Sequence, residues 1–118
     1  MNALELVGAA PETVSFPAGA LIFQEGAAGR RMFVVKKGSV EIMLHGRTVD
    51  VAEPGAIIGE MAMIDAQPRS ASAIAAADCE LVPLDRERFL ALVRETPAFA
   101  LHVMGVLADR LRLMDERS

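Results

Sequence analysis

The chain has 118 residues, the length of one domain, and a domain of that size buries roughly two thirds of the surface that its unfolded chain exposes. Its residues are 53% apolar but only 4% aromatic, with no tryptophan or tyrosine, so the core must be aliphatic. Sixteen acidic and twelve basic residues give a net charge of −4, which provides no general attraction to nucleic acid or anionic lipid. We therefore expect no direct nucleic-acid binding, and an anionic ligand needs a local site.

Cysteine content and the N-terminus indicate where the protein works. The single cysteine, Cys79, has no partner for an internal disulfide and cannot make a metal site alone, so we interpret it as a small buried residue in a strand. Residues 1–10 lack the basic region and long apolar run of a secretory signal. No stretch approaches about 18 uncharged apolar residues, the length of a membrane span. We expect a cytoplasmic protein without a membrane span.

The chain begins with a short predicted helix and continues as short strands. Asn2 is expected to cap a helix that ends near Gly8, before Pro11. Runs rich in apolar residues then alternate with turn sequences such as His45-Gly46 and Pro54-Gly55. Eight such strands suffice to close a small roll or barrel around one small ligand. The predicted strands are 13–16, 20–24, 31–36, 39–44, 47–52, 56–58, 71–77 and 79–84.

The last third of the chain is predicted to be helical. Asp85 is expected to cap one helix, and Thr96-Pro97 to end it and begin another. The second helix carries an apolar stripe that can pack on the strands, on a second copy or as a lid. We expect one domain over residues 1–118, with the strands in about 13–84 and the C-terminal helices in about 85–115. The stripe consists of Leu101, Met104, Leu107 or Ala108, Leu111 and Met114.

The segment from Gly55 to Ala73 is the strongest candidate for a binding site. Gly59 lets the backbone approach a ligand closely, and the single helical turn expected from Glu60 to Ile64 begins with free N–H groups. Such groups, together with the planar guanidinium of Arg69, suit a phosphate. Glu60 would repel a phosphate, so its presence indicates a ligand that also offers a hydroxyl donor, as a ribose does.

These residues resemble the phosphate-binding cassette of the cyclic nucleotide-binding domain, the beta-roll module of the catabolite activator family, of kinase regulatory subunits and of gated channels. The resemblance lies in 59–64, Gly-Glu-Met-Ala-Met-Ile, and in 68–72, Pro-Arg-Ser-Ala-Ser. It extends to the strand, glycine turn and strand of 33–41 and to the turn of 53–56. Ile58 and Met63 stand where the family often has Phe and Leu, a change that affects packing more than binding.

The resemblance implies a fold and a function. The fold is mainly β with flanking helices: an eight-stranded antiparallel beta-roll of jelly-roll type, with a short N-terminal helix and two C-terminal helices. The function is the binding of a cyclic nucleotide, cyclic AMP rather than cyclic GMP, with occupancy relayed through the C-terminal helices to a second copy or an effector protein. Arg69 would pair with the phosphate and Glu60 with the ribose 2′-hydroxyl. The implied pocket residues are Gly59, Glu60, Met61, Ala62, Arg69, Ser70 and Ala71, with Leu111 and Met114 as a possible lid over the base.

Other functions remain as alternatives. The same fold without a ligand would be a protein-interaction domain. A metal-dependent roll is not expected, because His45 and His102 lie far apart in the sequence and lack a third ligand. An enzyme is not expected either, since no nucleophile and base pair and no triphosphate-binding loop is present. We expect no cofactor beyond the nucleotide ligand.

Overall fold

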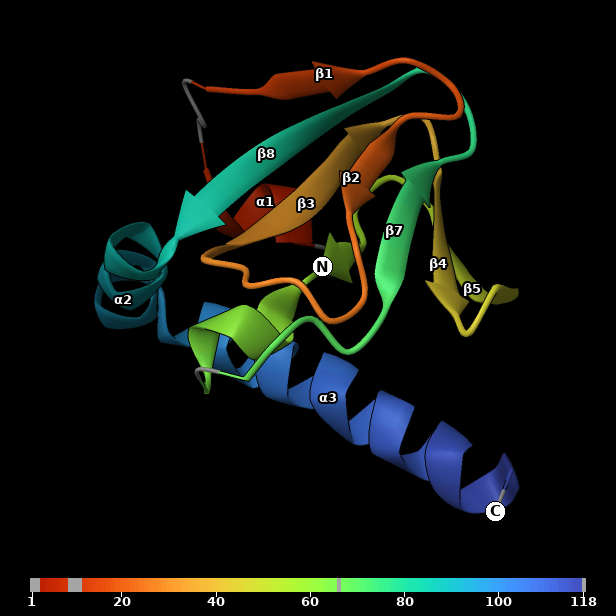
Figure 1. Ribbon diagram of the computed structural model, residues 1–118. Helices are drawn as coiled ribbons and strands as arrows, with labels where there is room; N and C mark the ends of the chain where they lie inside the picture. The colour runs from red at the N-terminus through yellow and green to blue at the C-terminus, as the bar shows by residue number, and fades with distance from the viewer. Residues whose placement is uncertain (1–2, 9–11, 66, 118) are drawn as a thin grey trace.

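The structure, a computed structural model, describes residues 3–8, 12–65 and 67–117, with side chains up to residue 112. Within these residues, eight antiparallel strands form two four-stranded sheets, as predicted, with α1 before them and α2 and α3 after them (Figure 1). The predicted cap, Asn2, lies outside the described residues. The elements are α1 (Ala3–Leu6), β1 (Val14–Phe16), β2 (Leu21–Phe23), β3 (Arg31–Lys37), β4 (Val40–Leu44), β5 (Arg47–Ala52), β6 (Ile57–Ile58), the 3-10 turn η1 (Glu60–Met63), β7 (Ser72–Ala75), β8 (Cys79–Asp85), α2 (Arg86–Glu95) and α3 (Pro97–Arg117).

The two sheets pair strands that are distant in the sequence. One sheet has the order β1-β8-β3-β6 and the other the order β2-β7-β4-β5. The predicted hairpin of β4 and β5 is confirmed: Leu44 pairs with Arg47, and His45 and Gly46 both have positive φ. That combination defines a turn whose twist matches the flanking strands. The turn positions β5 at one edge of its sheet.

The core consists of two layers that share β3. Phe33 and Val35 face the interior between the two sheets, whereas Met32 and Val34 face the helices. Side chains alternate between the two faces of a strand, so a run buried on both faces means that helices cover the outer one. Figure 1 shows α1, α2 and the start of α3 on that side of β3 and β8.

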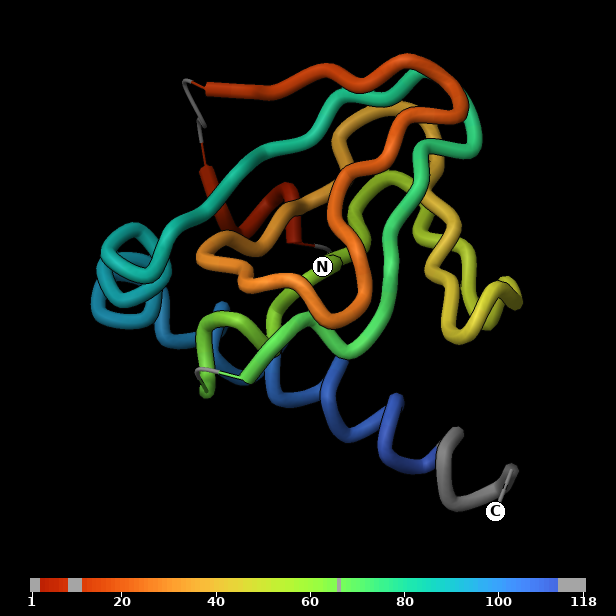
Figure 2. Tube along the Cα trace, in the orientation of Figure 1, coloured from red at the N-terminus to blue at the C-terminus, as the bar shows by residue number. Residues whose placement is uncertain are grey.

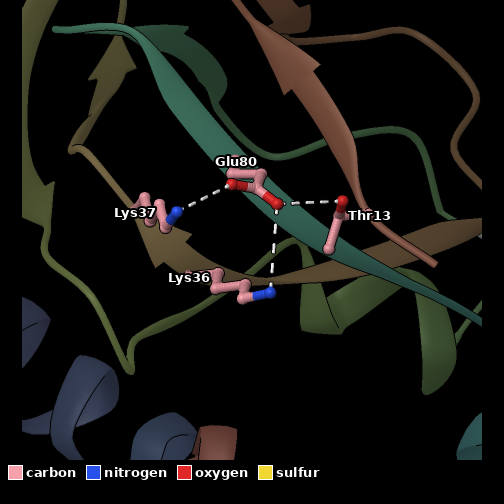
Figure 3. A network of polar contacts seen from close by, with 4 residues as sticks. All are labelled: Thr13, Lys36, Lys37 and Glu80. Atoms are coloured by element: carbon pink, nitrogen blue, oxygen red, sulfur yellow. Dashed lines mark hydrogen bonds and ion pairs between the residues drawn. The ribbon is translucent and has the colours of Figure 1, made fainter. Parts of the chain in front are cut away.

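A network of polar side chains connects β8 with the end of β3 and with the residue before β1. The carboxylate of Glu80 on β8 lies 3.9 Å from the Lys36 ammonium and 3.6 Å from the Lys37 ammonium at the end of β3. Thr13, directly before β1, donates its hydroxyl to the same carboxylate at 3.1 Å (Figure 3). Three neighbouring strands are thus connected at the surface, although exposed ion pairs of this kind stabilise a fold by less than about 1 kcal/mol.

The C-terminal helices begin where the sequence predicts, and α2 also ends there. The Asp85 side chain accepts the Arg88 N–H at 2.8 Å, which confirms the predicted cap of α2. Thr96 ends α2, and Pro97 begins α3. In the part of the chain that is described, no single helix is long and apolar enough to cross a membrane; α2 and α3 satisfy that length and composition test only as a pair bent by 117°.

The face of α3 that packs on the roll includes Leu107 of the apolar stripe seen in the sequence, but not Leu101, Met104 or Leu111. Phe99 and Val103 are buried, and Val106 and Leu107 pack beside them. The stripe residues Leu101, Met104 and Leu111 are instead 70%, 60% and 63% exposed. The sequence left open whether the stripe packs on the strands, packs on a second copy or forms a lid. Leu101, Met104 and Leu111 do not pack on the strands.

Phe99 is the residue that holds α3 against the rest of the core. It is fully buried and contacts Phe89 of α2 edge-on, with 5.7 Å between ring centroids. We expect Phe99→Ala to lower the free energy of unfolding by about 3 to 5 kcal/mol, because a large buried ring is lost and a cavity remains. Urea denaturation measures this change. Leu90→Ala, at an exposed position of α2, is the control and should cost much less.

Candidate functional site

A pocket of about 290 Å³ opens between the β4–β5 hairpin, the cassette and α3. The two strands contribute an apolar wall, and the cassette contributes polar backbone and one carboxylate. A more open hollow of about 490 Å³ lies along β1 and β8, but it contains no buried charged side chain among the residues described. The smaller pocket is lined by Phe23, Ile42, Leu44, Val49, Asp50, Ile58, Gly59, Glu60, Met61, Ala62, Gln67, Pro68, Arg69, Ser70, Ala71 and Arg110.

Gly59 shapes the entry to the cassette turn. Its φ of +72° is left-handed, a conformation in which other residues are strained. A Cβ atom at this position would lie 2.7 Å from Nη1 of Arg69. η1 then starts at Glu60, and no side chain caps it. Glycine is therefore required both for the turn and for the close approach of Arg69.

The guanidinium of Arg69 is held by backbone from two other segments. Nη1 donates to the Gly59 carbonyl at 3.2 Å, and Nη2 donates to the Arg31 carbonyl at 2.7 Å. The guanidinium carbon lies 4.2 Å from the centroid of the Phe23 ring, a cation–π contact. Nε is buried and has no hydrogen-bond partner among the described residues. Burial, with a smaller contribution from the nearby charge of Arg31, lowers the pKa of Arg69 from its ordinary value.

The loop between β2 and β3 forms hydrogen bonds with the backbone of Arg69. The Gly26 N–H donates to the Arg69 carbonyl and the Arg69 N–H donates to the Ala27 carbonyl, both at 2.8 Å. In Figure 2 this orange loop runs beside the green segment that leads into β7. Gly29 faces the Arg69 guanidinium so closely that any Cβ there would collide with it. The orientation of Arg69 thus depends on residues about forty positions earlier in the chain.

Glu60 is fully buried and pairs with Arg110 of α3. The Glu60 carboxylate forms an ion pair through Oε1 with Nη1 of Arg110, and Arg110 also donates from Nη2 to the Ile57 carbonyl at 3.1 Å. Oε2 has no hydrogen-bond donor among the residues that the structure describes. A buried carboxylate is costly without a partner, so Arg110 is what permits Glu60 to be charged in the pocket wall.

Arg110 itself lies partly in solvent at the pocket edge. Burial lowers the pKa of Arg110, and the negative charge of Asp50 opposes that shift. Arg110 was not among the site residues predicted from the sequence, although it lines the pocket. Its spacing contains a signal: Phe99, Val103, Val106 and Arg110 recur at helical intervals, so Arg110 continues the buried face.

All seven residues predicted for the pocket line it: Gly59, Glu60, Met61, Ala62, Arg69, Ser70 and Ala71. Of the two residues proposed as a lid, only Leu111 has a described side chain. Leu111 is exposed and does not line the pocket, and the side chain of Met114 lies beyond those described. No group of three or more His, Cys, Asp and Glu side chains among the described residues is arranged to hold a metal ion.

The fold and this site define a class of protein, a β-roll domain with a pocket of small-ligand size beside its cassette. Among known families, the family model of the cyclic nucleotide-binding domain matches residues 13–96 of this chain. The chain therefore belongs to the cyclic nucleotide-binding domain family, a family of regulatory ligand-binding modules and not of catalytic ones.

Several relatives are similar over most of this chain. The cyclic AMP receptor protein of Thermus thermophilus is 39% identical over 92% of the chain and 57% of its own length. A cyclic nucleotide-gated potassium channel of Mesorhizobium japonicum is 42% identical over 71% of the chain and 23% of its own length. The chain thus spans about half the length of the receptor protein and less of the channel.

Solved structures show the same arrangement of strands and helices. The Thermus thermophilus catabolite activator protein superimposes with a TM-score of 0.86 at 37% identity, over 97% of this chain and 56% of that one. A protein described with a cyclic-GMP-dependent signalling pathway of bacterial phytopathogenesis gives a TM-score of 0.80 at 28% identity, over 94% of both chains. The second structure thus matches nearly the whole of this chain.

The Glu60–Arg110 pair generates a stability prediction. Arg110→Met removes the partner of a buried carboxylate, a loss of about 3 to 5 kcal/mol where both groups are buried. For Arg110→Met we expect a loss of about 3 kcal/mol or less, because the Arg110 side chain is partly exposed. Adding Glu60→Gln should recover most of the loss, since the uncompensated charge is gone. Urea denaturation of the two single variants and the double variant measures the coupling.

The control for this cycle is Arg112→Met on the same helix. Arg112 is exposed and contacts only Asp109, at 3.4 Å, among the described residues. Its substitution should change the free energy of unfolding by no more than about 0.5 kcal/mol. An Arg110→Met variant as stable as this control would contradict the role given to the buried pair.

Proposed function

We propose that this domain binds cyclic AMP in the pocket between the β4–β5 hairpin, the cassette and α3. The observation that carries the proposal is that Arg69 and Glu60 line the same pocket, and that each has a buried polar atom, Nε and Oε2, without a hydrogen-bond partner among the described residues. One offers a donor to an anion and the other an acceptor to a hydroxyl. A ribose cyclic phosphate has both groups on one small ring system.

The phosphate would bind beside Arg69 and the first turn of η1. Bonds to the Gly59 and Arg31 carbonyls already orient the guanidinium, so less conformational entropy is lost when the ligand binds. Gly59 carries no Cβ that would keep the phosphate from the backbone. In a protein of net charge −4, this local arrangement supplies the attraction that the surface as a whole does not.

The ribose would bind Glu60 through its 2′-hydroxyl. The carboxylate is fixed by its ion pair with Arg110, and Oε2 is free to accept a hydrogen bond. A hydrogen bond to a charged group is worth about 1.5 to 3 kcal/mol. A 2′-deoxy ligand would leave this buried oxygen without a donor, so the pocket is suited to ribonucleotides.

The base would extend toward the apolar wall made by Ile42, Leu44 and Val49. We favour cyclic AMP over cyclic GMP because relatives named for cyclic AMP include the receptor protein described above and a cAMP-dependent protein kinase regulatory subunit of Eremothecium gossypii, 39% identical over 60% of this chain. Ser70 at the pocket edge is compatible with either base.

Occupancy would be relayed through α3. Arg110 connects this helix to Glu60, the residue proposed to hold the ribose, so a ligand that changes the environment of Glu60 changes what α3 contacts. A ligand shifts the position of a helix only if it contacts one arrangement better than the other. In the closed arrangement, Leu111 and Met114 would cover the base. The exposed Leu101 and Met104 would then present the new position of α3 to a second copy or an effector protein.

The exposed stripe on α3 also fits the alternative, a protein-interaction domain of the same fold that binds no nucleotide. Its three large apolar side chains are exposed along one helix. Loss of the arginine or the glutamate would have favoured that function, and this chain retains both. The two experiments that follow separate the alternatives.

Arg69→Ala should weaken the binding of cyclic AMP by about ten- to a hundredfold, since a charge-assisted contact worth about 1.5 to 3 kcal/mol is lost. Isothermal titration calorimetry measures the dissociation constant. Arg94→Ala, in the last turn of α2, removes the same charge outside the pocket lining and should leave the constant unchanged. Equal affinities for the Arg69 and Arg94 variants would remove Arg69 from the site.

A thermal-shift experiment tests binding itself. Cyclic AMP at a hundred times its dissociation constant should stabilise the domain by about 2.7 kcal/mol, because the ligand binds the folded state alone. The same concentration of 5′-AMP, which lacks the cyclic phosphate, should shift the transition less. If cyclic AMP and cyclic GMP both leave the transition unchanged, the interaction domain is the better description.

A further inference from the structure

The β4–β5 hairpin contains an irregularity that alters the pocket wall. Ile42 pairs with Asp50, but the next residue, Met43, pairs with Thr48, so Val49 is an extra residue in β5. Such bulges change the direction in which side chains point. Val49 and Asp50 are neighbours in the chain and would face opposite sides of a regular strand, yet both line the pocket. The bulge thus brings a carboxylate into the wall.

Asp50 differs from its surroundings in the wall. The other pocket residues of β4 and β5 are Ile42, Leu44 and Val49, all apolar. Oδ1 of Asp50 accepts the N–H of Val51 at 2.8 Å, which orients the carboxylate. Oδ2 accepts no hydrogen bond from any described residue. Oδ2 therefore remains available as an acceptor on a residue of the pocket wall formed by the hairpin.

The guanidinium of Arg110 does not form an ion pair with the Asp50 carboxylate. Arg110 is close enough for the charge of Asp50 to influence it, but the ion pair of Arg110 is with Glu60. No Lys or Arg nitrogen among the residues described lies within 4 Å of the Asp50 carboxylate. Asp50 is also exposed, so water can solvate its carboxylate at little cost before a ligand binds.

We infer that Asp50 recognises the base, by accepting a hydrogen bond from the 6-amino group of adenine. The inference rests on the proposed function, in which Arg69 and Glu60 hold the phosphate and ribose at the cassette and the base extends toward the hairpin. Adenine presents an amino donor at position 6, where guanine and hypoxanthine present a carbonyl acceptor. A carboxylate opposite that position attracts the donor and repels the acceptor. Asp50 is thus the specificity-determining residue of the pocket.

The sharpest probe is cyclic inosine monophosphate. It has the same phosphate and ribose as cyclic AMP, and its base carries a carbonyl oxygen where adenine carries the amino group. A site built to hydrogen-bond a polar group discriminates strongly against an analogue without it. We expect the wild-type domain to bind cyclic AMP about ten- to a hundredfold more tightly than cyclic inosine monophosphate.

Two substitutions test the assignment by calorimetry with both nucleotides. Asp50→Ala should bring the two affinities to within a few fold of each other. Asp50→Asn should shift the preference toward cyclic inosine monophosphate, because the amide can donate to the carbonyl oxygen. Glu53→Gln, in the turn after β5 and outside the pocket lining, removes the same charge and should leave the wild-type ratio intact.

The outcomes are distinguishable. An affinity ratio that Asp50→Ala leaves unchanged, or a loss of affinity equal for both nucleotides, would overturn the inference and assign Asp50 to balancing Arg110. Self-association of the Asp50→Ala variant with an unchanged ratio would also overturn it, and would indicate that the charge protects β5, an edge strand, from pairing. Failure of the wild-type domain to bind either nucleotide would instead refute the proposed function.

Discussion

The pocket depends on one interaction, the ion pair between buried Glu60 of the cassette and Arg110 of α3. A carboxylate without solvent is tolerated only with a compensating charge, and this charge comes from a helix fifty residues further along the chain. The pair therefore has two consequences. It permits a charged acceptor inside an aliphatic roll, and it makes the position of α3 part of the structure of the pocket.

The rest of the molecule holds these two groups in place. Helices cover the outer face of β3 and β8, and Phe99 anchors α3 there, so that Arg110 reaches the pocket edge three turns later. On the other side, the loop between β2 and β3 binds the backbone of Arg69. Glycines at 29 and 59 leave room for its guanidinium. The site is thus built at the junction of both sheets with one helix.

Much of the fold and of the cassette could be predicted from the sequence. Short apolar runs between turn sequences that contain Gly or Pro predict strands. The hairpin at His45-Gly46 and the cap at Asp85 follow from the preferences of these residues for turns and helix starts. The boundaries of the strands in the structure differ from the predicted ones by a residue or two. For example, the strand predicted over 71–77 is β7, Ser72–Ala75. The spacing of Gly59, Glu60 and Arg69 was sufficient to indicate an anion site, because all three act within one short segment.

By itself, the sequence determined the aliphatic roll, the cassette and the residues that face its pocket from that segment. Only the tertiary structure decided that Arg110 pairs with Glu60, that Leu101, Met104 and Leu111 face outward, and that a bulge brings Asp50 into the wall. The physical reason is that α3 has apolar residues on more than one face, so periodicity alone does not select the face that packs. A register shift likewise depends on how two strands pair, and no residue in either strand specifies it alone.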